Sequence, residues 1–127
     1  MIPNAIEVVT LFVDDIAAAK RFYCDVFTTE ILMEDEQSAL LSFSGAIVNL
    51  LAASDAPTLV TPLPVAPSRA GARAMFTVRV DDVRQTCARL TEKGVTILNG
   101  PIDRPWGRRT AAFADPSGHV WEVAEEI

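Results

Sequence analysis

Two pairs of segments recur in the same order in the two halves of the chain. The triplet Val-Asp-Asp at positions 13–15 returns at 80–82, and the octet SGAIVNLL at 44–51 is answered by SGHVWEVA at 117–124. The two octets are further apart in the chain than the two triplets. This difference places an insertion in the second half, between Asp82 and Ser117. Because this repeat is longer than the unit of solenoid proteins, it indicates a duplicated module.

Each copy shows the same succession of periodicities, a strand followed by a helix and then by three strands. In the first copy, 8–13 is a β-branched and aromatic run, and Asp14 or Asp15 can accept hydrogen bonds from the free amides of a helix start. Apolar residues spaced three and four apart then predict a helix over 16–27. The predicted strands that follow are 29–33, 39–43 and 46–52. The second copy predicts a strand at 76–80, a helix at 83–93 closed by Gly94, and strands at 95–98, 109–114 and 119–124.

The segment between the two copies is rich in proline. Pro57, Pro62, Pro64 and Pro67 cannot donate the amide hydrogen bonds of a sheet, so the segment 55–69 is predicted to be an extended crossover. The chain length of 127 residues suits one domain. The sequence therefore predicts one α+β domain, 1–127, made of module one (1–54), the crossover and module two (70–127).

Charge and cysteine content exclude several classes of partner. The chain has 17 acidic against 11 basic residues and a formal net charge of −6, and its basic residues are scattered. We therefore expect no nucleic-acid partner and no anionic membrane surface, whereas the acidic field favours a cationic ligand. The start of the chain lacks the pattern of an export signal, and no apolar run approaches the roughly 18–20 residues of a membrane span, so a cytoplasmic protein is expected. Cys24 and Cys87 fall in predicted helices and are expected to be free, packed thiols.

The two β-α-β-β-β modules, each with a Val-Asp-Asp turn, and the segment DPSGHVWE at 115–122 resemble the vicinal oxygen chelate superfamily. This superfamily includes glyoxalase I, ring-cleaving dioxygenases, fosfomycin-resistance enzymes and bleomycin-resistance binding proteins. The segment RPWGRR at 104–109 is most similar to the bleomycin-resistance-like branch. The resemblance implies mixed sheets that curl into an open, cupped barrel around a cleft, usually in a homodimer.

The resemblance also implies four positions for metal ligands, one on the first and one on the last strand of each module. These positions hold Val8, Asn49, Met75 and Glu122. Only Glu122 is a good ligand for a hard divalent ion, because Val8 has no donor atom and the Met75 thioether suits copper(I). His119 is the single histidine, and strand alternation places it on the opposite face from Glu122. We therefore expect no metal and no other cofactor.

Strand alternation also selects the side chains that face the cleft. If Leu11 and Val13 lie under the helix, Thr10 and Phe12 point the other way, and Asn49 and Glu122 are equivalent inward positions. The candidate ligand-binding residues are Thr10, Phe12, Asn49, Met75, Arg79, Trp106, Arg108 and Arg109. For Phe12 and Met75 simple packing is an equal alternative, and His119 and Trp121 are interpreted as structural.

Each charged or aromatic candidate has two interpretations. Glu122 is a general base or acid, or else it is a structural ion-pair partner of Arg79, Arg108 or Arg109. Arg108 and Arg109 clamp an anionic or carbonyl group of a ligand, or else they are solvated strand residues. Trp106 stacks on a planar ligand, or else it is a core aromatic that closes one end of the barrel.

Three functions follow, in order of preference. The first is a metal-independent binding protein that sequesters an antibiotic or another planar organic molecule. The second is a lyase or isomerase of the glyoxalase or dioxygenase type with Glu122 as general base. The third is a subunit-like module whose cleft is filled by Phe12, Met75 and Trp106. A homodimer is expected from the resemblance and from the sheet edges that need cover.

Overall fold

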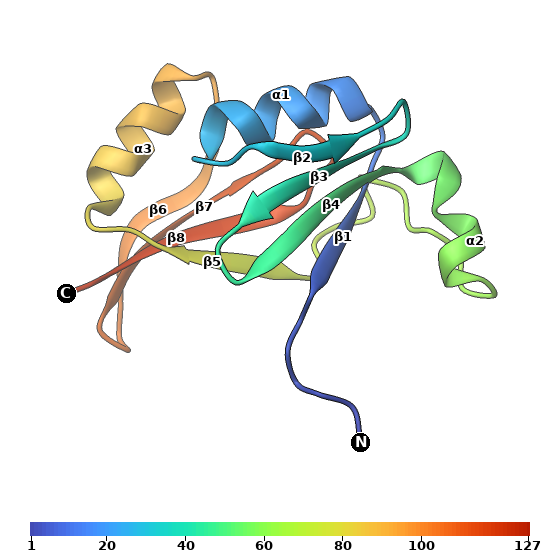
Figure 1. Ribbon diagram of the computed structural model, residues 1–127. Coiled ribbons are helices and arrows are strands. Elements are labelled where there is room, and N and C mark those ends of the chain that lie inside the picture. Colours follow the sequence, from blue (N-terminus) through green and yellow to red (C-terminus); the bar gives the residue numbers. More distant parts are fainter. The chain divides into compact units, whose positions relative to one another are not determined.

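The computed structural model describes residues 1–127 as two units, Met1–Ser68 and Arg69–Ile127 (Figure 1). Each unit contains a strand, a helix and three further strands in that order, as the repeat predicts. The first unit comprises β1 (Val8–Val13), α1 (Ile16–Val26), β2 (Ile31–Glu34), β3 (Ser38–Phe43) and β4 (Ala46–Ala52). The second comprises β5 (Met75–Arg79), α3 (Val83–Glu92), β6 (Ile97–Arg104), β7 (Arg108–Ala114) and β8 (Val120–Glu126).

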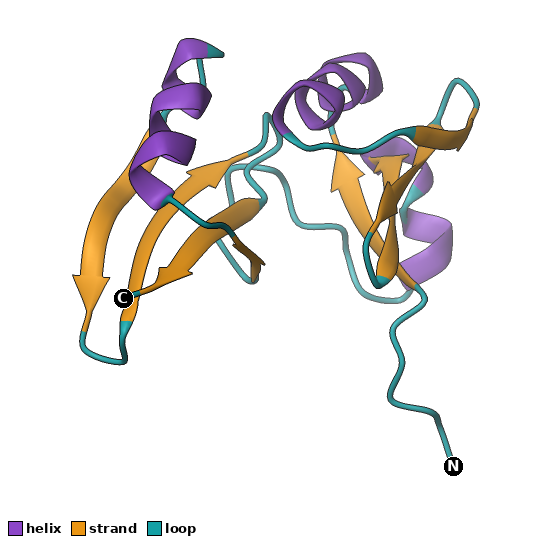
Figure 2. Ribbon diagram, turned by 60° about the vertical axis from the view of Figure 1, so that its left-hand side comes forward, coloured by secondary structure: helices purple, strands orange, loops and turns teal.

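Each unit builds one open, mixed sheet of four strands (Figure 2). Sheet A has the order β1-β4-β3-β2 and sheet B the order β5-β8-β7-β6. The first and last strands of each module pair in parallel and the other neighbours are antiparallel. The register repeats as well, because Thr10 lies beside Asn49 in sheet A and Thr77 lies beside Glu122 in sheet B. The predicted α+β class is confirmed, and neither sheet closes on itself.

The helix that follows the first strand of each module begins at the second aspartate of the repeated triplet. The carboxylate of Asp15 accepts a hydrogen bond from the Ala18 amide at 3.0 Å, and that of Asp82 accepts one from the Gln85 amide at 3.0 Å. An aspartate at this position satisfies an amide that the first turn leaves without a partner. The two equivalent caps explain why both copies turn from strand to helix at the same residue.

The core of each unit lies between its helix and one face of its sheet. In sheet A the buried strand residues include Leu11, Val13, Val48 and Leu50, and Tyr23 of α1 is fully buried. In sheet B the equivalent layer holds the following buried residues: Val83, Cys87, Leu90, Phe113, Trp121 and Val123. Because successive side chains of a strand point to opposite faces, this packing turns the alternate residues of every strand away from the helix.

The crossover differs from its prediction. It is not extended throughout, since a short 3-10 turn, Ala53–Asp55, leads into it and it contains a one-turn helix, α2 (Pro57–Val60). Pro57 is the first residue of α2, where a helix does not need the amide hydrogen that proline lacks. The prolines therefore argue against a strand in this segment, but they do not exclude a short helix.

Two other predictions from the sequence need correction. Strand β6 extends to Arg104, well beyond the predicted end at 98, because it pairs with β7 along most of its length.

The two cysteines differ in their surroundings. Cys24, expected to be packed, is exposed on α1. Cys87 is buried on α3, and burial raises the pKa of its thiol. Both cysteines are free, as expected.

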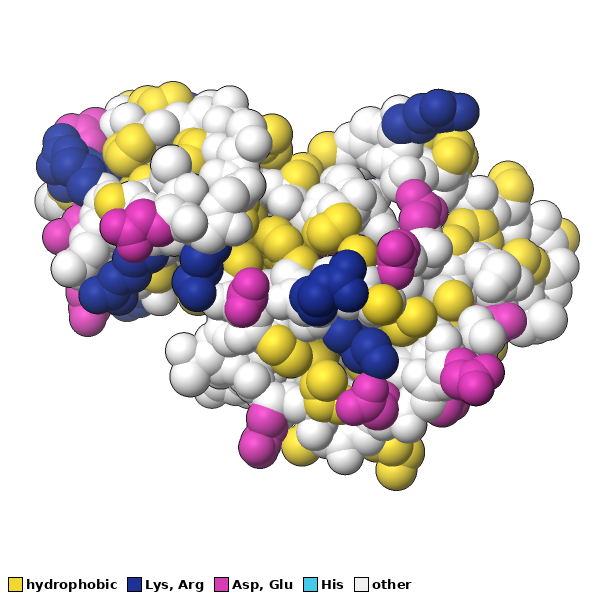
Figure 3. Space-filling model, turned by 90° about the horizontal axis from the view of Figure 1, so that it is seen from above, with side chains coloured by type: hydrophobic (Ala, Val, Ile, Leu, Met, Phe, Trp, Pro, Cys, Tyr) yellow, Lys and Arg dark blue, Asp and Glu magenta, His cyan; other side chains and the backbone are white.

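The surface carries charges of both signs. On the side drawn in Figure 3, acidic and basic side chains lie interspersed among apolar and uncharged ones. None of the helices is both long enough and apolar enough to span a lipid bilayer.

The conformation of Gly100 in β6 predicts a large effect of adding one methyl group. A Cβ at this residue would overlap the Thr110 carbonyl oxygen and lie 2.7 Å from the Ala111 Cα, and φ is +92°. Gly107 has a φ of +83° but open space around it. Gly107→Ala should therefore lower the free energy of unfolding by about 1–2 kcal/mol, because alanine is strained in the left-handed conformation. Gly100→Ala should lower it by about 1–3 kcal/mol more, because the added methyl group also overpacks the contact with β7.

Urea denaturation of both variants measures the difference in their free energies of unfolding. Equal losses for the two substitutions would contradict the close approach of β6 and β7 at Gly100.

Candidate functional site

The helix-distal face of sheet A carries a hydrogen-bonded polar pair on its two parallel strands, β1 and β4. The Asn49 Nδ2 atom donates to the Thr10 Oγ1 atom at 3.4 Å, and both residues are half-buried. The other amide atom, Asn49 Oδ1, is buried and has no hydrogen-bond partner. A buried acceptor without a partner lowers the free energy of unfolding by about 1–3 kcal/mol. The Asn49 amide therefore destabilises the folded protein.

Sheet B carries the equivalent pair at the same register position. The Thr77 hydroxyl donates to Glu122 Oε1 at 3.0 Å. The repeat thus places a threonine on the first strand of each module beside a polar residue on the last, an amide in one copy and a carboxylate in the other. Asn49 and Glu122 are equivalent, as strand alternation predicts, and each points away from its own helix.

The structure separates Glu122 from the arginines proposed as its partners. Arg79 pairs instead with Glu126, at 3.1 Å between Nη2 and Oε1, and both side chains are largely exposed. Arg109 pairs with Asp103 at 2.7 Å and with Glu125 at 3.3 Å. The structural ion pair considered for Glu122 is therefore not formed, and its carboxylate is bound by a neutral hydroxyl.

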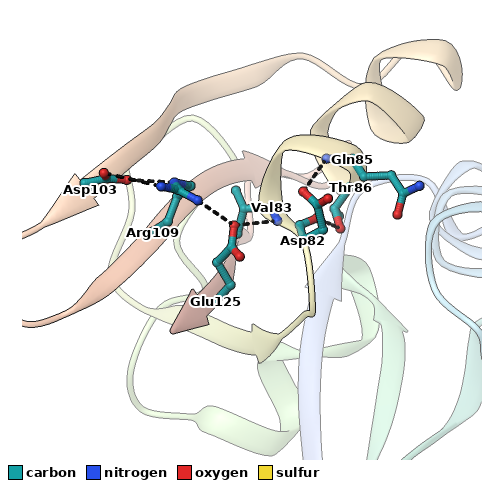
Figure 4. Close-up of polar contacts among 7 residues, drawn as sticks. All are labelled: Asp82, Val83, Gln85, Thr86, Asp103, Arg109 and Glu125. Carbon is teal, nitrogen blue, oxygen red and sulfur yellow. Dashed lines mark hydrogen bonds and ion pairs between the residues drawn. The ribbon is translucent and has the colours of Figure 1, made fainter. Parts of the chain in front are cut away.

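Arg109 belongs to a network on the face of sheet B that α3 covers (Figure 4). Glu125, opposite Arg109 on β8, also accepts the amide hydrogen of Val83 at 3.1 Å, at the first residue of α3. The hydrogen bond from Arg109 lowers the pKa of Asp103, and the same bond raises the pKa of Arg109. Arg109 thus joins β6, β7, β8 and α3, and it lies on the opposite face from the ligand-binding position predicted for it.

Arg104, which the sequence analysis did not select, lies on the helix-distal face of sheet B. Its Nε donates to Thr110 Oγ1 at 3.0 Å and its Nη2 to Asn99 Oδ1 at 3.2 Å. Arg108 is its direct cross-strand neighbour and forms no ion pair. Thr77 was likewise not selected, although its equivalence to Thr10 in the repeat was a signal that could have identified it.

Trp106 lies in the turn between β6 and β7 and is 68% exposed. The alternative interpretation as a core aromatic is therefore wrong. Met75 is half exposed on the edge strand β5, and Phe12 is half-buried on β1. An indole exposed at a hairpin tip is available to stack on a planar molecule.

His119 and Trp121 have the structural roles expected of them. The His119 ring Nδ1 lies 2.9 Å from Asp115 Oδ2, and the other carboxylate oxygen of Asp115 accepts the amides of Ser117 and His119 at 2.9 Å. These bonds brace the turn between β7 and β8. Trp121 is buried, with its ring centroid 5.2 Å from that of Phe76.

The four positions that the family resemblance assigns to metal ligands do not suit a hard divalent ion. Val8 presents an alkyl chain and Met75 a thioether, Asn49 is bonded to Thr10, and Glu122 is the single carboxylate and is bonded to Thr77. Catalytic zinc, iron and manganese sites are built from several imidazoles and carboxylates. This donor set supplies one carboxylate and no imidazole.

Sequence comparison identifies the family of this chain. The family model described as the Glyoxalase/Bleomycin resistance protein/Dioxygenase superfamily matches residues 5–123, so the chain belongs to this superfamily. Among characterised relatives, the metallothiol transferase FosB of Staphylococcus saprophyticus is 25% identical over 120 residues, which cover 94% of this chain and 76% of FosB.

Two solved structures illustrate the range of the fold. A glyoxalase/bleomycin resistance protein/dioxygenase from Nocardioides has a TM-score of 0.85 at 23% identity, covering 100% of this chain and 85% of its own. TnmS3, an antibiotic binding protein from Streptomyces sp. CB03234, has a TM-score of 0.75 at 25% identity, covering 100% of this chain and 99% of its own. Among these relatives, FosB is named as a transferase and TnmS3 as an antibiotic binding protein.

The buried, unpartnered oxygen of Asn49 predicts that the wild-type protein is less stable than a variant without it. Asn49→Val removes this acceptor from a central strand and introduces a side chain that favours strands. We expect the free energy of unfolding to rise by about 1 kcal/mol, measured by urea denaturation. Thr10→Val is the matched control, because it removes the partner hydroxyl and leaves the amide with no bond at all, and it should lower stability. A clear loss of stability for Asn49→Val would show that the amide supports the fold.

Proposed function

We propose that this protein is a metal-independent binding protein for a small, planar organic molecule. The observation that carries the proposal is the composition of the helix-distal face of sheet B. This face holds a carboxylate bonded to a neutral hydroxyl and two arginines without ion pairs, and the hairpin turn beside the arginines carries an exposed indole. Small-molecule sites are typically apolar and aromatic surfaces with a few placed polar groups.

The relatives support a binding role alongside an enzymatic one. TnmS3 is an antibiotic binding protein and is 25% identical over the whole of this chain. Sequestration requires contacts with the ligand but no catalytic group, which agrees with Val8 and Met75 at two of the four inherited ligand positions. The residues of sheet B that we assign to the ligand are Met75, Thr77, Trp106, Arg108 and Arg104.

A second candidate function is an enzyme that uses Glu122 as general base. The carboxylate of Glu122 is not engaged by any arginine, so it is free to accept a proton from a substrate near Thr77. FosB, at 25% identity, is an enzyme by name. This candidate needs substrate polarisation by arginine in place of a metal.

We further propose a homodimer. Both sheets have unpaired edges, and the edge strands β2 and β6 expose apolar side chains. The exposed residues are Leu32, Met33, Leu98 and Ile102. Edge strands with such side chains are normally covered by a partner or protected by charge.

Native mass spectrometry of freshly purified protein tests ligand, metal and assembly together. For the assembly, we expect twice the 13.8 kDa chain mass. We expect no stoichiometric zinc, iron or manganese. After incubation with a panel of quinone and glycopeptide antibiotics, we expect the mass to increase by one small organic molecule per chain. A divalent metal retained at one per chain would overturn the metal-independent function, and a strict monomer would overturn the dimer.

The substitution Glu122→Gln separates the two candidate functions. It keeps the shape and a hydrogen-bond acceptor for Thr77 but removes the base. For an enzyme, turnover of small ketones, thiohemiacetals or catechols should fall by about 10²–10⁴-fold. For a binding protein, no turnover is expected from either form, and ligand affinity should change by much less. Asp103→Asn on the α3 face is the control, since it is equally conservative and lies away from Glu122.

A further inference from the structure

Two arginines on the helix-distal face of sheet B are half-buried without a compensating carboxylate. Three of the chain's arginines are half-buried, namely Arg104, Arg108 and Arg109, and all others are exposed. Arg109 has two carboxylate partners, whereas Arg104 is held by two neutral groups and Arg108 forms no ion pair. Removing a charge from water without an opposite charge beside it is costly.

Arg104 and Arg108 also lie directly opposite each other. They are cross-strand partners in the antiparallel pair of β6 and β7, and like charges in this position destabilise a sheet. The nearest carboxylate by register is that of Glu126, opposite Arg108 on β8, but it is engaged by Arg79. The face therefore holds three arginines against two glutamates and is positive, although the whole chain carries −6.

The guanidinium of Arg104 is oriented by neutral partners. Thr110 is buried and binds its Nε, and Asn99 binds one terminal nitrogen. These bonds fix the planar group while leaving its charge unneutralised. A guanidinium fixed in this way is suited to bidentate contact with a carboxylate, phosphonate or phosphate oxygen pair.

The hairpin that joins the two arginines carries Trp106 at its turn. The indole is 68% exposed and is separated from Arg104 and Arg108 by one residue on each side. The same hairpin thus supplies both a stacking surface and a positive charge.

We propose that Arg104 and Arg108 form an anion subsite, and that the ligand of this protein is a planar organic acid. The inference rests on the proposed binding function and deepens it. It reverses the expectation of a cationic ligand that the acidic composition favours, because a ligand responds to the field of the face it touches rather than to the net charge of the chain.

Isothermal titration calorimetry with three probes of one shape tests the subsite. The probes are 2-naphthoate, neutral 2-naphthamide and 2-naphthylmethylammonium, each with the wild-type protein and with four variants. We expect naphthoate to bind at least about tenfold more tightly than the amide, and to weaken as salt is raised. Arg108→Gln should remove about tenfold of naphthoate affinity and leave the amide unchanged, and Arg104→Gln should do the same.

Two further variants provide the controls. Trp106→Ala should weaken both naphthoate and naphthamide, and Arg89→Gln, an exposed residue of α3, should change neither. The midpoint temperature of thermal unfolding distinguishes a binding role of Arg108 from a structural one. Arg108→Gln should keep or raise this midpoint, because it removes one of two like charges that lie opposite each other. Loss of an arginine that stabilises the fold would lower it.

The outcomes distinguish the subsite from the binding function itself. If the amide or the ammonium probe binds as well as naphthoate, the anion subsite is wrong and the binding function stands. A preference for naphthoate that survives Arg108→Gln and Arg104→Gln likewise overturns the subsite. If no naphthyl probe binds at millimolar concentration, both the subsite and a site for planar ligands are overturned.

Discussion

The packing of one amphipathic helix on one face of each four-stranded sheet is the contact from which the other features of this protein follow. In both units it buries the alternate residues of the central strands, such as Leu11 and Leu50 in sheet A and Trp121 and Val123 in sheet B. Since side chains alternate along a strand, the residues between them must point away from the helix. Thr10, Asn49, Thr77 and Glu122 occupy those positions in register. The hydrophobic layer thus selects which residues are available for chemistry.

Duplication gives the two units the same framework but different chemistry. The amide of Asn49 and the carboxylate of Glu122 occupy the same place in equivalent sheets, each beside a threonine. In sheet A the amide retains a buried oxygen without a partner, which costs stability. In sheet B the carboxylate accepts the hydroxyl hydrogen of Thr77 and pairs with no arginine. The two copies therefore differ in the polar groups on the helix-distal faces of their sheets, while both keep apolar residues at the core-forming positions.

Ion pairing divides the arginines of the second unit into two groups. Arg109 is bound by Asp103 and Glu125 and connects three strands to the start of α3, so it serves the fold. Arg104 and Arg108 are also half-buried but have no carboxylate partner, and they lie directly opposite each other on the two strands of the hairpin. This arrangement costs stability, and the proposed anionic ligand would supply the missing negative charge. The adjacent Arg108 and Arg109 point to opposite faces of sheet B.

The sequence by itself determined the duplicated module, the order of strands and helices, the aspartate caps and the faces on which Thr10, Asn49 and Glu122 lie. These features depend on local periodicity and on residue types whose preferences act over a few neighbours. Tertiary structure alone decided that Arg109 joins Asp103 and Glu125, that Trp106 is exposed, and that Arg104 lies opposite Arg108. Ion pairing and burial depend on strand register and on distances between residues far apart in the chain, and a register shift of one position exchanges the two faces of a strand.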